Sequence, residues 1–339
     1  MNESKISLII TSIAAPNAAM KIFAQEAKNR NINFIVIGDT KSPPDFAIQN
    51  CQFFSIADQD RSKFRLAKVL PKKHYARKNI GYLLAAGSDI IIETDDDNFP
   101  KNEFWNKRSI NVKAKIVGEE GWVNIYRAFS NIPIWPRGFP LEYISSSTPY
   151  LEKDQTELIC PIQQGLADEN PDVDAVYRMC RELPVNFDKR LPVAIGKNSW
   201  CPFNSQNTTW FRESFPLLYL PSYCSFRMTD IWRSFIAQRI AWTCGWSILF
   251  HNSTVWQERN EHNLLKDFED EIPGYLNNAK MCGMLEDLDL LDGENNIIEN
   301  LLRCYSMLCK NNFIGNEEMK LVEAWIGDIS DSLQFKGSK

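Results

Sequence analysis

The first third of the chain alternates short apolar runs with segments that have helical periodicity. The apolar runs are KISLIIT (5–11), INFIVIGD (32–39) and SDIIIETDDD (88–97), and helical patterns cover about 17–30 and 75–86. Strands that are apolar along their whole length are buried on both faces, and the helices between them supply the crossovers that parallel strands require. The sequence therefore predicts an α/β fold with a mostly parallel central sheet flanked by helices.

Polar residues stand at the point where each of these three runs ends. Thr11 and Ser12 follow the first run, Asp39 ends the second, and Asp95–Asp97 close the third. In open parallel sheets, ligands bind beyond the carboxyl ends of the strands. We therefore expect these side chains to meet at one edge of the sheet and to form a ligand site there.

The aspartate triplet is the strongest chemical signal in the sequence. Carboxylates this close repel one another unless a cation or a ring of donors compensates, and Mg²⁺ and Mn²⁺ prefer such oxygen ligands. Alternate side chains of a strand point the same way, so Asp95 and Asp97 are expected to hold Mn²⁺ (or Mg²⁺) against a nucleoside diphosphate. Asp97 is the first choice for direct contact and Asp96 points elsewhere. The competing interpretation is an acidic, solvated turn.

Composition excludes several classes of partner and place. A net charge of -5, without a block of five like charges, gives no support for nucleic-acid binding. The nine cysteines include no CxxC pair, which indicates thiols in a reducing compartment and predicts a cytoplasmic location. No run reaches the roughly 20 apolar residues of a membrane helix. We expect no transmembrane segment and, at most, peripheral membrane association through the Trp-rich segment 231–250.

Six segments in order resemble the STELLO-type glycosyltransferase-like family. They are VIGDTKSP, HYARKNIGYLLAAGSDIIIETDDDNFP, IWPRGFPLEYI, NSQNTTWF, MTDIWRSFIAQRI and VWQERNEHNLLKDFEDEIPGYL, and the resemblance covers roughly residues 5–278. It implies a GT-A-type, Rossmann-like fold and a glycosyltransferase that transfers a hexosyl or pentosyl group. The expected division is a nucleotide-sugar-binding and catalytic domain over 1–255 and a mainly helical extension over 256–339 that packs on it.

The resemblance implies that one set of side chains binds the nucleotide part of the donor: Thr11, Ser12, Asp39, Arg77, Lys78, Asn79, Asp95, Asp96 and Arg259. Thr11, Ser12 and Asp39 would meet the nucleoside, and the cationic residues would offset the charge of the diphosphate. Asp39 is equally well explained as a residue that stabilises a turn, and Lys78 as part of a solvated helix face. For Asp96, contact with the ribose and a structural role both stay open.

The same resemblance implies candidates for the rest of the site. A late histidine often completes the metal sphere of GT-A enzymes, and His262 and His251 are the candidates. Asp230 resembles the acidic residue on the acceptor side and would be the general base of an inverting reaction. Arg137, in IWPRGF, would border the sugar or acceptor pocket, as would 204–207. The alternatives are an N-cap role for Asp230 and a proline-fixed structural loop around Arg137.

These observations lead to one leading functional hypothesis and two alternatives. The leading hypothesis is metal-dependent transfer of a sugar from a nucleotide-sugar, with a UDP-sugar first, to a glycan or other hydroxyl acceptor in polysaccharide biosynthesis. UDP-arabinopyranose mutases have a similar Asp-Asp-Asp strand end, so a nucleotide-sugar mutase is the second hypothesis. The third is a scaffold that retains the fold without catalysis.

Overall fold

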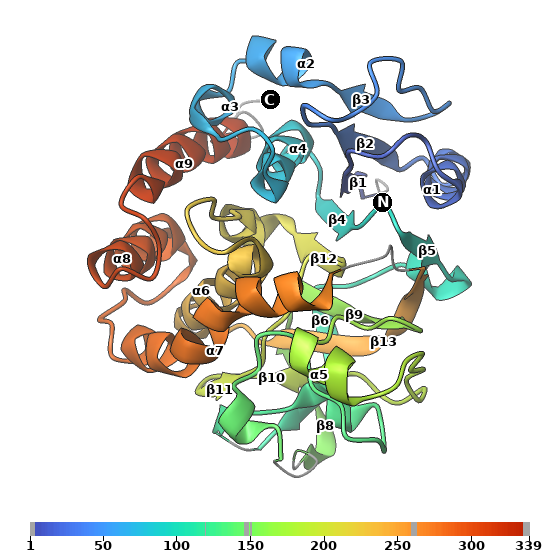
Figure 1. The fold of residues 1–339 in the computed structure, drawn as a ribbon. Coiled ribbons are helices and arrows are strands. Elements are labelled where there is room, and N and C mark those ends of the chain that lie inside the picture. Colours follow the sequence, from blue (N-terminus) through green and yellow to red (C-terminus); the bar gives the residue numbers. More distant parts are fainter. Residues whose placement is uncertain (1–3, 119, 146–148, 150, 259–262, 335–339) are drawn as a thin grey trace.

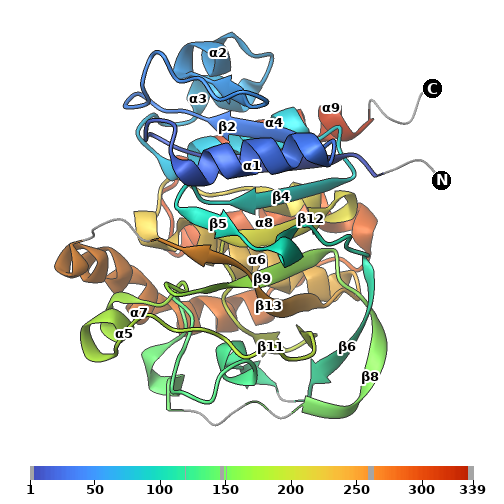
Figure 2. The same cartoon turned by 90° about the vertical axis from the view of Figure 1, so that its right-hand side faces the viewer.

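The computed structural model describes residues 4–118, 120–145, 149, 151–258 and 263–334. Eleven of the described strands form one sheet in the order β3-β2-β1-β4-β12-β9-β13-β10-β6-β8, with β5 paired to β13. Figure 2 shows the strands stacked from β2 near the top to β8 near the bottom. The α/β class and the central sheet flanked by helices are therefore confirmed.

The strands of the main sheet are β1 (Ile6–Thr11), β2 (Asn33–Ile37), β3 (Gln52–Phe54), β4 (Ile90–Thr94), β5 (Asn98–Pro100), β6 (Asn111–Val117), β8 (Leu151–Ile159), β9 (Ile162–Asp168), β10 (Val193–Ile195), β12 (Asn207–Phe211) and β13 (Ile248–Gln257). A separate two-stranded sheet pairs β7 (Gly121–Trp122) with β11 (Ser199–Trp200).

The α-helices are α1 (Ala18–Asn29), α2 (Ile56–Arg61), α3 (Arg65–Val69), α4 (Lys78–Ala85), α5 (Ala175–Cys180), α6 (Thr229–Thr243), α7 (Leu264–Glu286), α8 (Ile297–Lys310) and α9 (Glu318–Gln334). Two short 3₁₀ helices precede α4 and α6 directly, namely η1 (Tyr75–Arg77) and η6 (Phe226–Met228). No helix in the described ranges is long and apolar enough to cross a membrane.

The N-terminal part of the sheet is parallel, as its apolar runs predict. Strand β1 pairs in parallel with both β2 and β4, and β2 pairs in parallel with β3. Beyond β4 the sheet is mixed, because β12 runs antiparallel to both β4 and β9 while β13 is parallel to β9. The carboxyl ends of β1, β2 and β4 consequently lie at one edge of the sheet.

Helices cover both faces of this parallel part (Figure 1). On one face, Met20 and Phe23 of α1 pack in a cluster with Leu8 and Phe34, while Ile80 of α4 packs with Ile9 on the other face. Asn17 caps α1 by accepting a hydrogen bond from the backbone of Met20 at 2.9 Å. Both faces of the strands are thus buried, which explains their continuous apolar sequence.

Gly81 lets α4 approach the sheet closely. A Cβ atom at this position would lie 2.6 Å from a methyl carbon of Ile9 and 2.9 Å from a side-chain carbon of Ile37. Any larger residue would force α4 away from β1 and β2. The glycine therefore fixes the helix that carries Lys78 close to the sheet edge where the polar residues gather.

The C-terminal helices extend the main core of the molecule. The apolar faces of α8 and α9 are both largely buried, with Leu301, Leu308, Val322, Trp325 and Ile329 at most 1% exposed. The indole of Trp325 donates a hydrogen bond to the carbonyl of Pro216 at 2.9 Å. Strand β13 runs through the boundary expected at residue 256, and the division into two domains stays a prediction.

Helix α9 also supplies a remote cap to α3. Phe64 precedes α3 and caps it with no side-chain hydrogen bond. Instead, the carboxylate of Asp328 accepts hydrogen bonds from the backbone of Arg65 at 3.0 Å and of Leu66 at 2.9 Å. These are backbone donors at the start of a helix, which have no partner within the helix itself.

Candidate functional site

The polar strand ends meet in a cavity of about 460 Å³ at the carboxyl edge of the parallel strands. Thr11 and Ser12 line it from the end of β1, and Asp39 lines it from the end of β2. The three aspartates line it from the turn that joins β4 to β5, and Arg137 and Asp230 also line it. The cavity thus contains most of the residues that the sequence nominated.

The aspartates lie in a turn and not in the strand from which their orientation was predicted. Strand β4 ends at Thr94, so the alternation of side chains along a strand does not apply to 95–97. The three side chains nevertheless make separate contacts. Asp95 accepts a hydrogen bond from the Tyr75 hydroxyl at 2.9 Å and lies 3.4 Å from the Lys78 ammonium, while Asp97 accepts one from Gln257 at 3.0 Å.

Asp96 has contacts that attach the turn to the first strand and helix. Its carboxylate accepts a hydrogen bond from the Ser12 hydroxyl, and its carbonyl accepts one from the Asn17 side chain at 2.7 Å. Asn17 is also the cap of α1. Of the two roles left open for Asp96, these contacts favour the structural one.

Burial changes the acidity of the triplet. Desolvation raises the pKa of Asp95 to about 7, while Lys78 acts in the opposite direction and Asp97 adds to the rise. Desolvation also raises the pKa of Asp96, partly offset by the Ser12 hydroxyl. A bound cation stabilises the ionised form of neighbouring carboxylates, which is otherwise costly. The electrostatics of this turn therefore suit a cation.

The donor set fits a hard cation whose sphere is open. Asp95 and Asp97 present carboxylate oxygens at the cavity wall, and all three aspartates are half-buried. Within the described ranges, no group of three or more His, Cys, Asp and Glu side chains is arranged to hold a metal ion. Mg²⁺ sites commonly use one or two carboxylates and complete the sphere with water and substrate phosphates, and Asp95 and Asp97 match that arrangement.

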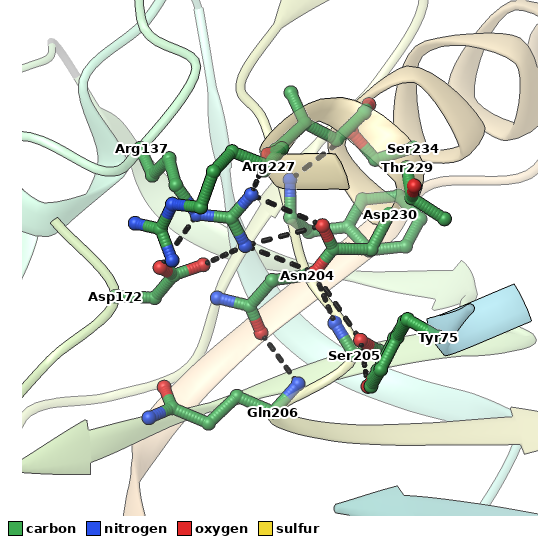
Figure 3. A network of polar contacts seen from close by, with 12 residues as sticks. Tyr75, Arg137, Asp172, Asn204, Ser205, Gln206, Arg227, Thr229, Asp230 and Ser234 are labelled. Carbon is green, nitrogen blue, oxygen red and sulfur yellow. Dashed lines mark hydrogen bonds and ion pairs between the residues drawn. The ribbon is translucent and has the colours of Figure 1, made fainter. Parts of the chain in front are cut away.

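In the lining of the same cavity, Arg137 forms ion pairs with two carboxylates (Figure 3). Its guanidinium donates to Asp172 twice, at 2.8 Å each, and to the two oxygens of Asp230 at 3.0 and 3.1 Å. Arg137 also donates to the carbonyl of Arg227. All three charged groups of this network are more than nine-tenths buried, so their mutual attraction is only weakly screened.

Gly138 and the first turn of α6 determine where this network lies. Gly138 has a φ of +86°, and a Cβ there would collide with a methyl carbon of Ile231, so the loop runs directly against α6. Asp230 is in the first turn of α6, but the N-cap position belongs to Met228, which makes no side-chain cap. The N-cap interpretation of Asp230 is therefore wrong, and the carboxylate points to Arg137 instead.

Asp230 is a strongly ionised carboxylate. Burial alone would raise its pKa, but Arg137 outweighs that effect by charge and hydrogen bonding and lowers the pKa to about 2. One carboxylate oxygen of Asp230 lies within hydrogen-bond distance of Ser205, 3.2 Å from both the backbone nitrogen and the hydroxyl of that serine. Asp230 is therefore charged at neutral pH, and its contacts with Arg137 and Ser205 hold its carboxylate in position.

Four of the candidate residues that the structure describes lie outside the cavity lining, namely Arg77, Lys78, Asn79 and His251. The Arg77 guanidinium is fully buried and donates to Gln59 at 2.6 and 2.8 Å, because it fills the space between η1 and α2. The Asn79 amide exchanges hydrogen bonds of 2.8 Å with the backbone of Leu220. His251 is buried in β13 with its Nδ1 3.0 Å from the carbonyl of Asn252. In these positions they do not face a ligand in the cavity.

Two other nominations, Arg259 and His262, lie outside the described residues. Lys78 is fully buried below the cavity, where its ammonium lies 2.7 Å from the Tyr75 hydroxyl and 2.9 Å from the Thr94 carbonyl. It is therefore not part of a solvated helix face. Through Asp95 it still neutralises charge at the site.

Several lining residues were missed in the sequence. Tyr75 and His74 belong to the HYARK segment, in which only the basic residues were predicted to bind the ligand. Lys41 and Lys73 are exposed cations on the cavity wall, and Gln257 reaches it from the end of β13. For His74 and Tyr75, the available signal was the Lys-Lys-His-Tyr run at 72–75, because this polar run directly follows a strand–helix unit.

Comparison with known proteins adds a family likeness to this geometry. The family model described as STELLO glycosyltransferases matches residues 227–339. Two curated proteins of Arabidopsis thaliana are similar to the chain: "Probable glycosyltransferase STELLO2", 27% identical over 87% of this chain, and "Probable glycosyltransferase STELLO1", 26% identical over 89%. The chain spans 41% and 42% of the lengths of these two relatives.

Two solved structures resemble the fold more distantly. A mycobacterial protein shares 12% identity with a TM-score of 0.42, over 82% of this chain and 75% of that one. Glucosyl-3-phosphoglycerate synthase from Mycobacterium tuberculosis, in complex with phosphoglyceric acid, shares 10% identity with a TM-score of 0.41, over 82% of this chain and 80% of its own.

Proposed function

We propose, from the similarity of the chain to the STELLO glycosyltransferases, that it transfers a sugar from a nucleoside-diphosphate donor, a UDP-sugar first, to a hydroxyl acceptor with the help of Mn²⁺ or Mg²⁺. One observation carries the proposal. A carboxylate triplet suited to a cation and an ionised Asp230 line the same cavity, and they come from different elements, the turn after β4 and the first turn of α6. A donor side and an acceptor side in one cavity are what group transfer needs.

The donor half of the proposal rests on the charges around the triplet. Asp95 and Asp97 would hold the divalent ion, which supplies charge stabilisation for the departing nucleoside diphosphate. Lys41 and Lys73 on the cavity wall would neutralise further phosphate charge. The Thr11 hydroxyl is buried and has no hydrogen-bond partner within the described part of the chain, which suits a hydrogen bond to the nucleoside.

The acceptor half rests on Asp230. In the proposed step, the acceptor oxygen forms a bond to the anomeric carbon while the bond to the diphosphate oxygen breaks, and the proton of the acceptor hydroxyl goes to Asp230. Arg137 lowers the basicity of Asp230, so proton transfer is expected late, when the new bond has already made the hydroxyl more acidic. Arg137 would act by orienting Asp230.

The test is a binding and turnover screen of UDP-, GDP-, CMP- and TDP-sugars with and without Mn²⁺. We expect Mn²⁺ to increase the affinity for one nucleoside diphosphate at least tenfold in calorimetry, and Asp97→Ala to abolish that increase. Glu103→Ala, which changes an exposed acidic residue outside the cavity lining, serves as the control. Equal affinity with and without the metal would contradict the metal assignment.

The same screen separates the proposal from its two alternatives. A transferase releases nucleoside diphosphate only as sugar reaches an acceptor or water, whereas a mutase converts the sugar without release. If no nucleotide-sugar binds, the non-catalytic scaffold is the hypothesis that remains. The cytoplasmic location and the role in polysaccharide biosynthesis stay predictions from the sequence.

A further inference from the structure

A second cavity, of about 500 Å³, lies at the other end of helix α6. The first cavity is lined by Asp230 in the first turn of α6, and the second by Arg239, Trp242 and Thr243 in its last turns. Thr243 lies thirteen positions after Asp230, which corresponds to about 20 Å along a helix. None of the residues that line the first cavity lines the second.

Trp242 and Leu290 are the large apolar side chains that line this second cavity. Trp242 is half-buried, and its ring centroid lies 4.5 Å from that of Trp200, which is 1% exposed. Trp200 in turn packs against Phe235, at 6.0 Å between ring centroids. An aromatic side chain held by a buried aromatic cluster loses little conformational entropy when a ligand packs against its exposed part.

The polar surface of the cavity is also held in position. Arg239 donates to the carbonyls of Leu285 and Leu288 at 2.7 Å each, and its guanidinium carbon lies 5.8 Å from the centroid of Trp242. Glu286 accepts a hydrogen bond from the Trp200 indole, and Glu120 accepts one from Asn198 at 3.0 Å. Each carboxylate can accept about four hydrogen bonds, so both retain capacity for hydroxyl donors.

The charge of the lining selects among ligand classes. Glu120, Glu286 and Asp292 oppose Lys197 and Arg239, so the cavity has both signs and a slight negative excess. Phosphates and polyanions are repelled by the carboxylates, and a purely apolar ligand would leave the polar groups without partners. A neutral ligand with many hydroxyls meets both requirements, because its C–H face covers the indole while its hydroxyls bond to carboxylates and amides.

From these contacts we propose that the cavity beside Trp242 is a second saccharide-binding site, which takes a neutral oligosaccharide. The inference goes beyond the proposed function, since it concerns binding alone and needs neither a metal ion nor a nucleotide. In the context of that function, the site would hold a glycan at a distance from the reacting centre. The two sites would then share helix α6 as their spacer.

The test uses saturation-transfer NMR on the full chain with neutral hexasaccharides of glucose, mannose, galactose and xylose as probes. At least one probe is expected to bind, and Trp242→Ala should weaken its binding at least tenfold. Trp242→Phe, which retains an aromatic face, should restore most of the affinity, and Glu286→Gln should have an intermediate effect. Trp105→Ala changes a half-buried tryptophan outside both cavities and should leave binding unchanged.

The outcomes distinguish this site from the first cavity. Binding that survives Trp242→Ala, or that is lost in Asp97→Ala, overturns the inference, as does the absence of binding for every probe. Circular dichroism of each variant shows whether a loss of binding comes from unfolding, and the Phe variant decides the case if Trp242→Ala does not fold. Failure here leaves the response of nucleotide binding to Mn²⁺ untouched.

Discussion

The hydroxyls of Tyr75 and Ser205 lie 2.6 Å apart and join the two sides of the candidate active site. Tyr75 donates to Asp95 at 2.9 Å, so the Ser205 hydroxyl is the donor to Tyr75, and the backbone nitrogen of Ser205 donates to Asp230 at 3.2 Å. A continuous chain of hydrogen bonds therefore connects the carboxylate expected to hold the metal with the carboxylate expected to take a proton. Such a chain fixes the distance between the two groups.

Removal of the Tyr75 hydroxyl should weaken the donor side. Tyr75→Phe leaves the ring in place but takes one hydrogen-bond donor from Asp95, so we expect affinity for UDP with Mn²⁺ to fall about tenfold, or ~1.4 kcal/mol. Calorimetric titration measures this change. Tyr143→Phe alters a tyrosine outside the cavity and is the matched control. Equal affinities for the two variants would show that the hydroxyl does not position Asp95.

Substitution of Asp230 should separate transfer from donor binding. Asp230→Asn keeps the shape of the side chain but cannot take a proton, so we expect nucleotide affinity to change less than threefold while transfer falls by about 10²–10⁴. Asp172→Asn disturbs the same arginine without removing the proposed base and should cost less than Asp230→Asn. A fully active Asp230→Asn variant would exclude the base role.

The pKa of Asp230 also predicts how stability depends on pH. Its pKa is lowered from 3.8 to about 2 in the folded protein, chiefly by Arg137 against the effect of burial, so the folded state binds this proton less readily than the unfolded chain. The resulting stabilisation, on the order of 2 kcal/mol, is present above about pH 4 and is lost as the pH falls towards 2.

Urea unfolding of the wild type and Asp230→Asn at pH 6 and pH 2.5 measures that stabilisation as a difference. The two proteins should differ in free energy of unfolding at pH 6 and differ clearly less at pH 2.5. Asp188→Asn, in an exposed pair with Arg190, should have a small effect at both pH values. A difference that does not depend on pH would argue against the depressed pKa.

A buried ion pair attaches strand β4 to helix α6. Arg233 lies 2.8 Å from Glu93, both side chains are at most 1% exposed, and the Tyr82 hydroxyl also bonds to Glu93. Arg233→Met should destabilise the fold by about 3–5 kcal/mol, because Glu93 remains buried without its cation. The double variant Glu93→Gln, Arg233→Met should recover part of that loss in urea unfolding.

The control for this experiment is an exposed pair. Lys266→Met removes the cation from Glu269 on the surface of α7 and should change stability by less than about 0.5 kcal/mol. If Arg233→Met behaved in the same way, the buried pair would not contribute to the position of α6 on β4.

Sequence patterns predicted the parts of the site that depend on topology. Continuous apolar strands imply parallel pairing, and parallel pairing brings Thr11, Asp39 and the triplet to one edge. What periodicity cannot resolve is which of two neighbouring side chains faces the ligand. Arg77 and Lys78 are adjacent, yet Arg77 donates to Gln59 and Lys78 to Asp95. Arg77 ends a 3₁₀ helix and Lys78 begins α4, so the periodicity of one α-helix does not describe both side chains.

Partners brought in by long loops were also beyond prediction. Asp172 lies between β9 and α5, and nothing local in its sequence marks it as the residue that shares Arg137 with Asp230. The same holds for Gln257, whose contact with Asp97 spans 160 residues of sequence. Such contacts depend on how the mixed half of the sheet packs, which periodicity does not encode.

The remote cap on α3 has a consequence for how the chain is made. The first turn of this helix depends on the carboxylate of Asp328, 263 residues after the backbone nitrogen that it caps. At about 5–20 residues per second, a ribosome adds that carboxylate roughly 10–50 s after Arg65. During that interval α3 has an uncapped start, so newly made chains would be accessible to chaperones there until α9 has been synthesised and has docked.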